Sequence, residues 1–264
     1  MVAQPPVSRA AVPGTELLDP RWLEDRISEM GISWGTGDAR VSGTLWWCMA
    51  ASSLIAPIVE AFATGSAAMD PALEHIACEI RPDGGIERVF PVPGIGEFDD
   101  LEMAGSILGD IAADVTVGEW AGAGERPSTP GAGAGPGADS CCGAAPDEHG
   151  CSIGHRLRVS LSRVIPVVAQ VSGASVPSLW AIVADAIGNR ALDAGDQDAA
   201  ARLAHEVAGR LPVPRFSDIG SRTFVRRISC CLVFEVPGSE MCTSCPKRPA
   251  AQREKLLYEL ATRG

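Results

Sequence analysis

The sequence predicts a mainly α-helical protein with a minor β-hairpin (α+β), in which a helical domain is followed by a small cysteine-rich C-terminal segment. Three observations predict this fold. Apolar residues recur at helical spacing over most of the chain, one stretch near residue 80 alternates like a hairpin, and four of the nine cysteines lie between residues 230 and 245. With 264 residues, 46% of them hydrophobic, the chain can bury a sizeable core.

The N-terminal part is expected to begin with a disordered stretch at 1–14, followed by a helical and hairpin part at 15–120. Asp19 can cap the first helix, Pro20 suits its first turn, and Gly31 can end it. The helix signals therefore start close to residue 20.

After this helix the pattern predicts a central helix and then the hairpin. A helix over about residues 44–64 is apolar on nearly all sides, which predicts a position in the centre of the domain. Residues 75–80 and 86–90 are strand-like, and the Pro and Gly residues between them favour a turn. Cys78, in the first strand, is expected to be a small buried side chain. A further helix is predicted over 98–117.

Residues 121–150 differ in composition from the rest, because Gly, Ala and Pro dominate them. Such a stretch cannot bury enough surface to offset the entropy of ordering, so it is predicted to be a flexible insertion. Cys141, Cys142 and Cys151 lie in it or just after it. These thiols could form a second metal site or be accessible thiols in a loop. The second interpretation is favoured, because three thiols on loose backbone do not make a preorganised site.

A second helical part is predicted at 151–220, and the C-terminal segment with its closing helix at 221–264. Ser152 can cap a long helix through about residue 170, and Pro166 is expected to kink that helix or end it early. The remaining predicted helices cover 176–192, 194–211 and about 249–261, the last with Leu256, Leu257 and Leu260 on its inward face.

The four C-terminal cysteines form the pattern C-C-x10-C-x2-C, with Cys230 next to Cys231, and Cys242 three residues before Cys245. Thiolates grouped in one short segment are typical ligands of a soft metal centre. A turn between Cys242 and Cys245 can direct both sulfurs to one metal, whereas the side chains of adjacent residues diverge. Two metals joined by sulfide offer ligand positions farther apart than one tetrahedral ion does. The spacing therefore favours an iron–sulfur cluster over zinc.

This motif, preceded by Arg226 and Arg227 and followed by proline, resembles the [2Fe-2S] signature of the FhuF-type ferric-siderophore reductases. The resemblance extends over most of 15–260, but it is specific only near the C-terminus. Upstream, residues 45–47 and 179–180 are similar to places in that family. The resemblance implies that the four cysteines hold a [2Fe-2S] cluster.

The same resemblance implies one-electron reduction of Fe(III)-siderophore complexes, usually of the hydroxamate type, with release of Fe(II). Arg226 and Arg227 would lie beside the cluster, where their charge stabilises the reduced state and orients an anionic ligand or donor. Trp46 and Trp180 are candidate docking side chains, although a core position also fits both. No P-loop and no G-x-G-x-x-G after a strand occurs in the sequence. The electron would therefore come from an outside donor, such as a ferredoxin or a small flavoprotein.

The net charge of −11 argues against a nucleic-acid binder. Residues 205–256 nevertheless carry nine Lys or Arg and five acidic residues. An anionic ligand or an acidic redox partner explains this basic stretch as well as a chance grouping of solvated arginines does. Neither a secretory signal nor a transmembrane segment is predicted, because polar residues interrupt the nearest candidate at 45–63. We expect a cytoplasmic location, where thiols stay reduced; loose association with the inner face of the membrane is compatible with it.

Two other functions stay open. The four cysteines could form a structural zinc site that stabilises a binding module, or the cluster could serve a redox sensor or regulator. Colour separates the zinc site from the cluster, since only the cluster absorbs visible light that dithionite bleaches. A gel-shift assay with DNA separates the regulator from the reductase.

Overall fold

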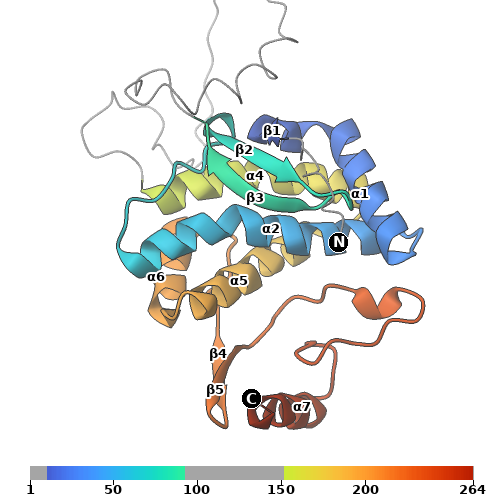
Figure 1. The fold of residues 1–264 in the computed structure, drawn as a ribbon, viewed down its shortest axis with the longest axis vertical. Helices are drawn as coiled ribbons and strands as arrows, with labels where there is room; N and C mark the ends of the chain where they lie inside the picture. Colours follow the sequence, from blue (N-terminus) through green and yellow to red (C-terminus); the bar gives the residue numbers. More distant parts are fainter. Residues whose placement is uncertain (1–10, 93–151, 264) are drawn as a thin grey trace, which may run out of the picture. The chain divides into compact units, whose positions relative to one another are not determined.

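The computed structural model describes residues 11–92 and 152–263, in which helices predominate and the strands form two small antiparallel sheets (Figure 1). The predicted fold class is confirmed. The predicted helix at 98–117, the insertion at 121–150 and the cysteines at 141, 142 and 151 lie outside the described residues. The described helices are α1 (Pro20–Trp34), α2 (Ala39–Thr64), α4 (Ile153–Ser172), α5 (Val176–Asp193), α6 (Gln197–Val207) and α7 (Ala250–Thr262).

Helix α2 is the centre of this helical arrangement, as its apolar sequence predicts. It packs against α1, α4, α5 and α6, and its contact with α5 is the most extensive. Trp46 and Trp47 are both fully buried. Their indole nitrogens donate hydrogen bonds to backbone carbonyls at 2.9 Å for Gly84 and 3.0 Å for Leu179, so each buried N–H has a partner. The two tryptophans thus tie α2 to the hairpin turn and to α5.

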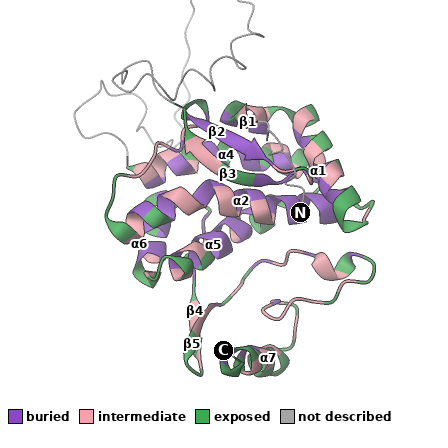
Figure 2. Cartoon of the chain, viewed as in Figure 1, coloured by how far each residue is buried: buried purple, intermediate pink, exposed green. Residues whose placement is uncertain are grey.

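Among the described residues, α2 is the one helix long and apolar enough to cross a membrane by length and composition. More than half of its most apolar window, 56%, is buried inside the protein. Its hydrophobicity is therefore used in the packing of the core (Figure 2).

The helix ends differ from the predictions in several places: α2 begins at Ala39 and not near residue 44, and α6 covers Gln197–Val207 and not 194–211. Helix α1 does not stop at Gly31 but continues to Trp34, where Gly35 caps it with a φ of 70°. Gly31 serves a close helix contact instead, since a Cβ there would lie 2.6 Å from the Ser42 hydroxyl of α2. Pro166 does not end α4 either, because buried residues on both sides of it hold the helix against the core.

The predicted hairpin is present as β2 (Ile76–Ile80) and β3 (Ile86–Pro91), and Cys78 is fully buried in it. A third strand, β1 (Ala11–Pro13), pairs antiparallel with β2, so the order is β1-β2-β3. The prediction of disorder through residue 14 is therefore wrong for 11–14. A strand of three residues carries too little pattern to be recognised, and its pairing with β2 makes it ordered.

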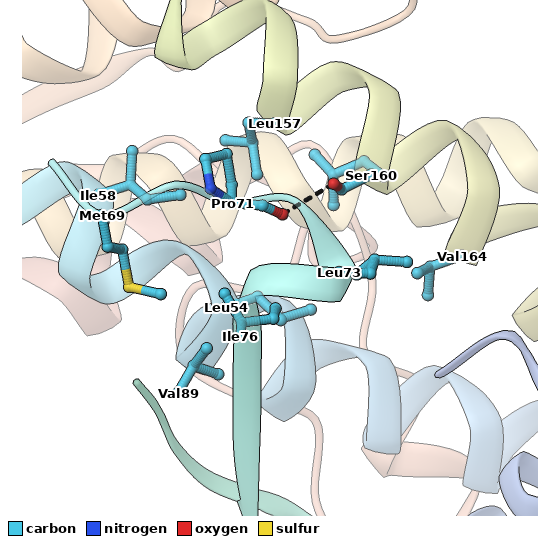
Figure 3. A pocket seen from close by; sticks show the side chains of 11 residues that line it. Leu54, Ile58, Met69, Pro71, Leu73, Ile76, Val89, Leu157, Ser160 and Val164 are labelled. Carbon is cyan, nitrogen blue, oxygen red and sulfur yellow. Dashed lines mark hydrogen bonds between the residues drawn. The ribbon is translucent and has the colours of Figure 1, made fainter. Parts of the chain in front are cut away.

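The sheet, α2 and α4 enclose a small apolar hollow of about 20 Å³ (Figure 3). Its walls are aliphatic side chains such as Leu54, Ile58 and Val164. The buried Ser160 hydroxyl donates a hydrogen bond of 2.8 Å to the Pro71 carbonyl, so it is satisfied within the wall. This hollow is an imperfection of core packing, too small for a ligand.

The C-terminal part begins with the hairpin of β4 (Phe216–Ile219) and β5 (Arg222–Val225) and ends with α7. Residues 226–248 between them, here called the cysteine segment, contain only one short 3-10 turn, Val233–Glu235. Helix α7 contacts β4 and is mostly exposed (Figure 2). Of its three leucines predicted to face inward, only Leu257 is buried, while Leu260 is 43% exposed.

Candidate metal centre

The four thiols of the cysteine segment gather as two pairs. The sulfurs of Cys230 and Cys245 lie 3.7 Å apart. Cys231 and Cys242 lie close enough for each thiol to shift the pKa of the other. Each pair thus combines one of the adjacent cysteines with one cysteine of C-x2-C.

Local backbone geometry explains this pairing. Leu232, directly after the adjacent cysteines, has a φ of 62°, an uncommon left-handed conformation for a leucine. It turns the chain sharply into the 3-10 turn. Cys242 and Cys245 are joined by a tight turn, in which the Cys245 amide donates to the Cys242 carbonyl at 3.2 Å. Arg248 donates to the same carbonyl at 2.9 Å and so holds the turn from outside.

In the described part of the chain, no three or more His, Cys, Asp or Glu side chains lie in an arrangement that could hold a metal ion, and the thiols approach one another in pairs. Two separate thiol pairs fit a centre with two irons, since each iron of a [2Fe-2S] cluster takes two protein ligands. The donor set is right for the cluster, because thiolates are its usual ligands.

Asp185 of α5 anchors the start of the cysteine segment, and sequence analysis did not single it out. Its carboxylate accepts hydrogen bonds from the backbone amides of Ile228 at 3.0 Å and Ser229 at 2.9 Å. The Ser229 hydroxyl also donates to it at 2.5 Å. Both Asp185 and Ser229 are buried, with 5% and 3% of their surface exposed. The sequence did offer a signal: Asp185 is an acidic residue among the apolar residues of a predicted core helix. A carboxylate buried there needs hydrogen-bond or ionic partners.

The two arginines before the cysteines have different surroundings. Arg227 is 17% exposed in its side chain, and its Nε lies 3.4 Å from the Asp185 carboxylate. Its Nη1 is 3.7 Å from the Cys242 sulfur. Arg226 is exposed, and its backbone N–H donates a hydrogen bond to the Arg215 carbonyl. Of the two arginines predicted beside the cluster, Arg227 is the one that contacts a thiol.

The protein environment favours a thiolate at Cys231. A hydrogen bond from the Cys242 thiol lowers the pKa of Cys231 to about 5, with further help from the Val233 amide and Arg227. The same hydrogen bond raises the pKa of Cys242. Burial raises the pKa of Cys230. Because the thiolate is the metal-binding form, this environment prepares Cys231 to bind a metal.

A fifth cysteine, Cys48 of α2, lies close enough to interact electrostatically with Arg227, Cys231, Asp185 and Cys230. Burial raises the pKa of its thiol to about 12, so it stays protonated at neutral pH in the metal-free chain. Cys48 therefore contributes a neutral, apolar wall beneath the cysteine segment.

The structure does not support docking roles for Trp46 and Trp180. Trp46 is fully buried and Trp180 is 4% exposed, and both belong to the core. Their rings offer no surface to a substrate, which corrects the expectation taken from the family resemblance. Both indole rings are buried in the core, Trp46 on α2 and Trp180 on α5, where their large apolar area contributes to packing.

Two hollows border the cysteine segment. The larger, here called the Cys230 groove, measures about 680 Å³ and includes Arg40, Thr44, Ser178, Cys230 and Lys247 in its walls. The smaller, here called the arginine hollow, measures about 250 Å³ and includes Ser217, Arg226, Arg227, Ser244 and Arg253. No residue lines both, so the segment presents two different surfaces.

Residues 227–247 match the family model described as the FhuF 2Fe-2S C-terminal domain. The match includes all four cysteines of the segment as well as Arg227. No curated protein and no solved structure matches the chain. The cysteine segment is thus similar to the FhuF 2Fe-2S C-terminal domain, as the sequence predicted, and the cofactor of this chain is a [2Fe-2S] cluster.

Proposed function

We propose that the protein reduces Fe(III)-siderophore complexes by one electron and so releases Fe(II). The observation that carries this proposal is the arrangement of four thiols as two pairs within a segment that matches the FhuF 2Fe-2S C-terminal domain. In this proposal Cys230 and Cys245 hold one iron of the cluster, and Cys231 and Cys242 hold the other.

A [2Fe-2S] cluster, when bound, supplies one-electron transfer. The proposed reaction consumes one electron from an external donor and converts Fe(III) in the chelate to Fe(II). Hard oxygen chelators bind Fe(III) far more strongly than Fe(II), so the reduced metal leaves. We take the substrate to be a hydroxamate-type chelate and the donor to be a ferredoxin or a small flavoprotein, acting in the cytoplasm.

The residues of this chain have positioning and electrostatic roles. Asp185 fixes the backbone before Cys230 through Ile228 and Ser229. Arg227 brings a positive charge to Cys242, and that charge offsets the negative charge of the thiolates. The carboxylate of Asp185 in turn keeps Arg227 in place.

The test is anaerobic purification with iron and sulfide analysis, followed by stopped-flow oxidation of the dithionite-reduced protein by ferric chelates. Two irons and two sulfides per chain, together with Fe(II) trapped by ferrozine in step with reoxidation, are expected. A colourless protein with one zinc per chain contradicts the proposal and supports the zinc module. A cluster that no ferric chelate reoxidises contradicts the reductase and leaves the sensor, for which DNA binding is the next measurement.

A further inference from the structure

The Cys230 groove has the size of a small-molecule site and borders a cysteine of the cluster segment. Its volume of about 680 Å³ lies within the range of roughly 300–1,000 Å³ that ligand sites occupy. Its walls come from α2, from the start of α5 and from the cysteine segment, with Cys230 half-buried in one wall. A ligand in this groove would therefore lie against one of the thiols proposed to hold iron.

The charge of the groove favours an anion. Two of its lining residues, Arg40 and Lys247, are basic, and none of its described lining residues is acidic. Both basic side chains interact with the same carboxylate, Glu235, to which Lys247 is 3.9 Å away. One carboxylate between two cations leaves an excess of positive charge at the rim.

The start of α5 adds to this potential. Ser175 caps the helix, and Pro177 and Ser178 of its first turn line the groove. The N-terminal end of an 18-residue helix carries a partial positive charge. The exposed hydroxyls of Ser175 and Ser178 lie 2.7 Å apart and share one hydrogen bond, which leaves one O–H to donate to an oxygen atom of a ligand.

An apolar surface complements these polar groups. Ala181, Ile228 and Leu232 line the groove, and Ile228 is 40% exposed although it adjoins the buried Ser229. Such a combination suits an oxygen-rich chelate whose organic backbone needs apolar contact. A small inorganic anion would leave that surface unused.

We propose that the Cys230 groove is the docking site of the ferric chelate, and that it prefers hydroxamate chelators that also carry free carboxylates over neutral or cationic trihydroxamates. This inference rests on the proposed function and specifies the substrate class and the surface that receives it. Arg40 and Lys247 contact the carboxylates, and Ile228 contacts the organic backbone. The iron then lies on the Cys230 side of the segment, apart from the arginine hollow.

The inference can be tested with Ga(III) complexes, which have the shape and charge of the Fe(III) complexes but are not reduced. Binding of three gallium chelates to the oxidised holoprotein is measured by calorimetry: a mixed hydroxamate–carboxylate, a neutral trihydroxamate and a cationic trihydroxamate. Ser178→Trp fills the groove, and Ser217→Trp adds the same bulk in the arginine hollow as the matched control. Visible circular dichroism and iron content verify that each variant retains its cluster.

The wild type and Ser217→Trp are expected to bind the carboxylate-bearing chelate most tightly, and Ser178→Trp at least about tenfold more weakly. Arg40→Gln and Lys247→Gln are each expected to lose about fivefold for that chelate and little for the neutral one. Equal affinity of Ser178→Trp and wild type overturns the groove as the site. Tightest binding of the cationic chelate overturns the carboxylate preference.

The failure of this inference and of the proposed function can be distinguished. Stopped-flow reoxidation by the corresponding ferric chelates is followed for the wild type and Ser178→Trp. If no chelate reoxidises the wild type, the proposed function fails. If the wild type is reoxidised and Ser178→Trp reacts at the same rate, the function stands and only the groove assignment is overturned.

Discussion

The helical body and the cysteine segment are held in place by different interactions. In the body, which comprises α1, α2 and α4–α6, aliphatic and indole side chains fill a continuous core around α2. The cysteine segment has one short 3-10 turn and joins this core only through Leu232 and Val236 and the residues beside them, and polar contacts, chiefly those of Asp185 and Arg248, hold its backbone on either side. Core packing tolerates many sequences of similar volume, whereas a polar anchor depends on individual atoms. Substitutions in the two regions should therefore have separable effects on stability and on the cluster.

The largest expected effect comes from replacing a cysteine. Cys245→Ser removes one of the four thiols and leaves the body untouched, because Cys245 lies in an irregular turn. We expect loss of most of the iron and of the visible absorption, with far-ultraviolet circular dichroism close to that of the wild type. Cys78→Ser is the control, since Cys78 lies in β2 and should leave the iron content unchanged. Full iron content in Cys245→Ser would exclude Cys245 as a ligand.

Trp47→Ala tests the opposite region. It removes a fully buried indole and the partner of the Leu179 carbonyl, at an expected cost of about 3–5 kcal/mol in unfolding free energy. Denaturant unfolding monitored by far-ultraviolet circular dichroism measures this cost. Below the unfolding transition the cluster spectrum should match that of the wild type. A changed spectrum in a folded variant would show that core packing also shapes the cysteine segment.

Asp185→Asn tests the link between the two regions. The asparagine amide has the size of the carboxylate, but it carries no charge and has only one acceptor oxygen. It therefore cannot accept all of the hydrogen bonds from Ile228 and Ser229. It also leaves the Arg227 guanidinium without its ion-pair partner. We expect a local cost of about 2–3 kcal/mol, seen as reduced iron loading and faster loss of the cluster to a chelator. Asp193→Asn, at the exposed end of the same helix, is the matched control. Equal cluster loss in both variants would refute the anchor.

Arg227→Gln has the smallest expected effect and sharpens the difference between the two arginines. Removing the charge beside Cys242 disfavours the reduced state, so the midpoint potential should fall by roughly 20–40 mV, the equivalent of about 0.5–1 kcal/mol for one electron. Spectroelectrochemical titration measures the shift. Arg226→Gln, an exposed position, should shift the potential less. Equal shifts would show that the midpoint potential responds to the charge of either arginine at long range and not to the contact of Arg227 with Cys242.

Several features of the fold could be predicted because local sequence determines them. The caps Asp19 and Ser152 were found, since each side chain accepts a hydrogen bond from the first turn that follows it. The C-terminal stop at Gly31 was wrong, because the glycine is needed for contact with α2, which lies in another part of the chain. Of the two effects predicted for Pro166, the early helix end is wrong for a similar reason: α4 continues to Ser172, where core packing compensates the local break.

The candidate site shows the same division. The cysteine pattern predicted a two-iron centre, and the match to the FhuF 2Fe-2S C-terminal domain confirms the cofactor. Asp185 was not predicted, because it lies more than forty residues from the cysteines and its role depends on α5 meeting the segment. Gly188 of the same helix allows close packing of β5, which leads into the segment, since a Cβ there would lie 3.1 Å from a Val225 methyl group.

The helical class and the central position of α2 could be predicted from the sequence, and the cysteine spacing favoured an iron–sulfur cluster over zinc. Periodicity and ligand spacing are local properties that can be recognised without a fold. The pairing of the thiols, the arginine that contacts a thiol and the position of the Cys230 groove became known from the tertiary structure. Each of these depends on contacts between segments that are separate in the sequence, and a local sequence pattern does not predict such contacts.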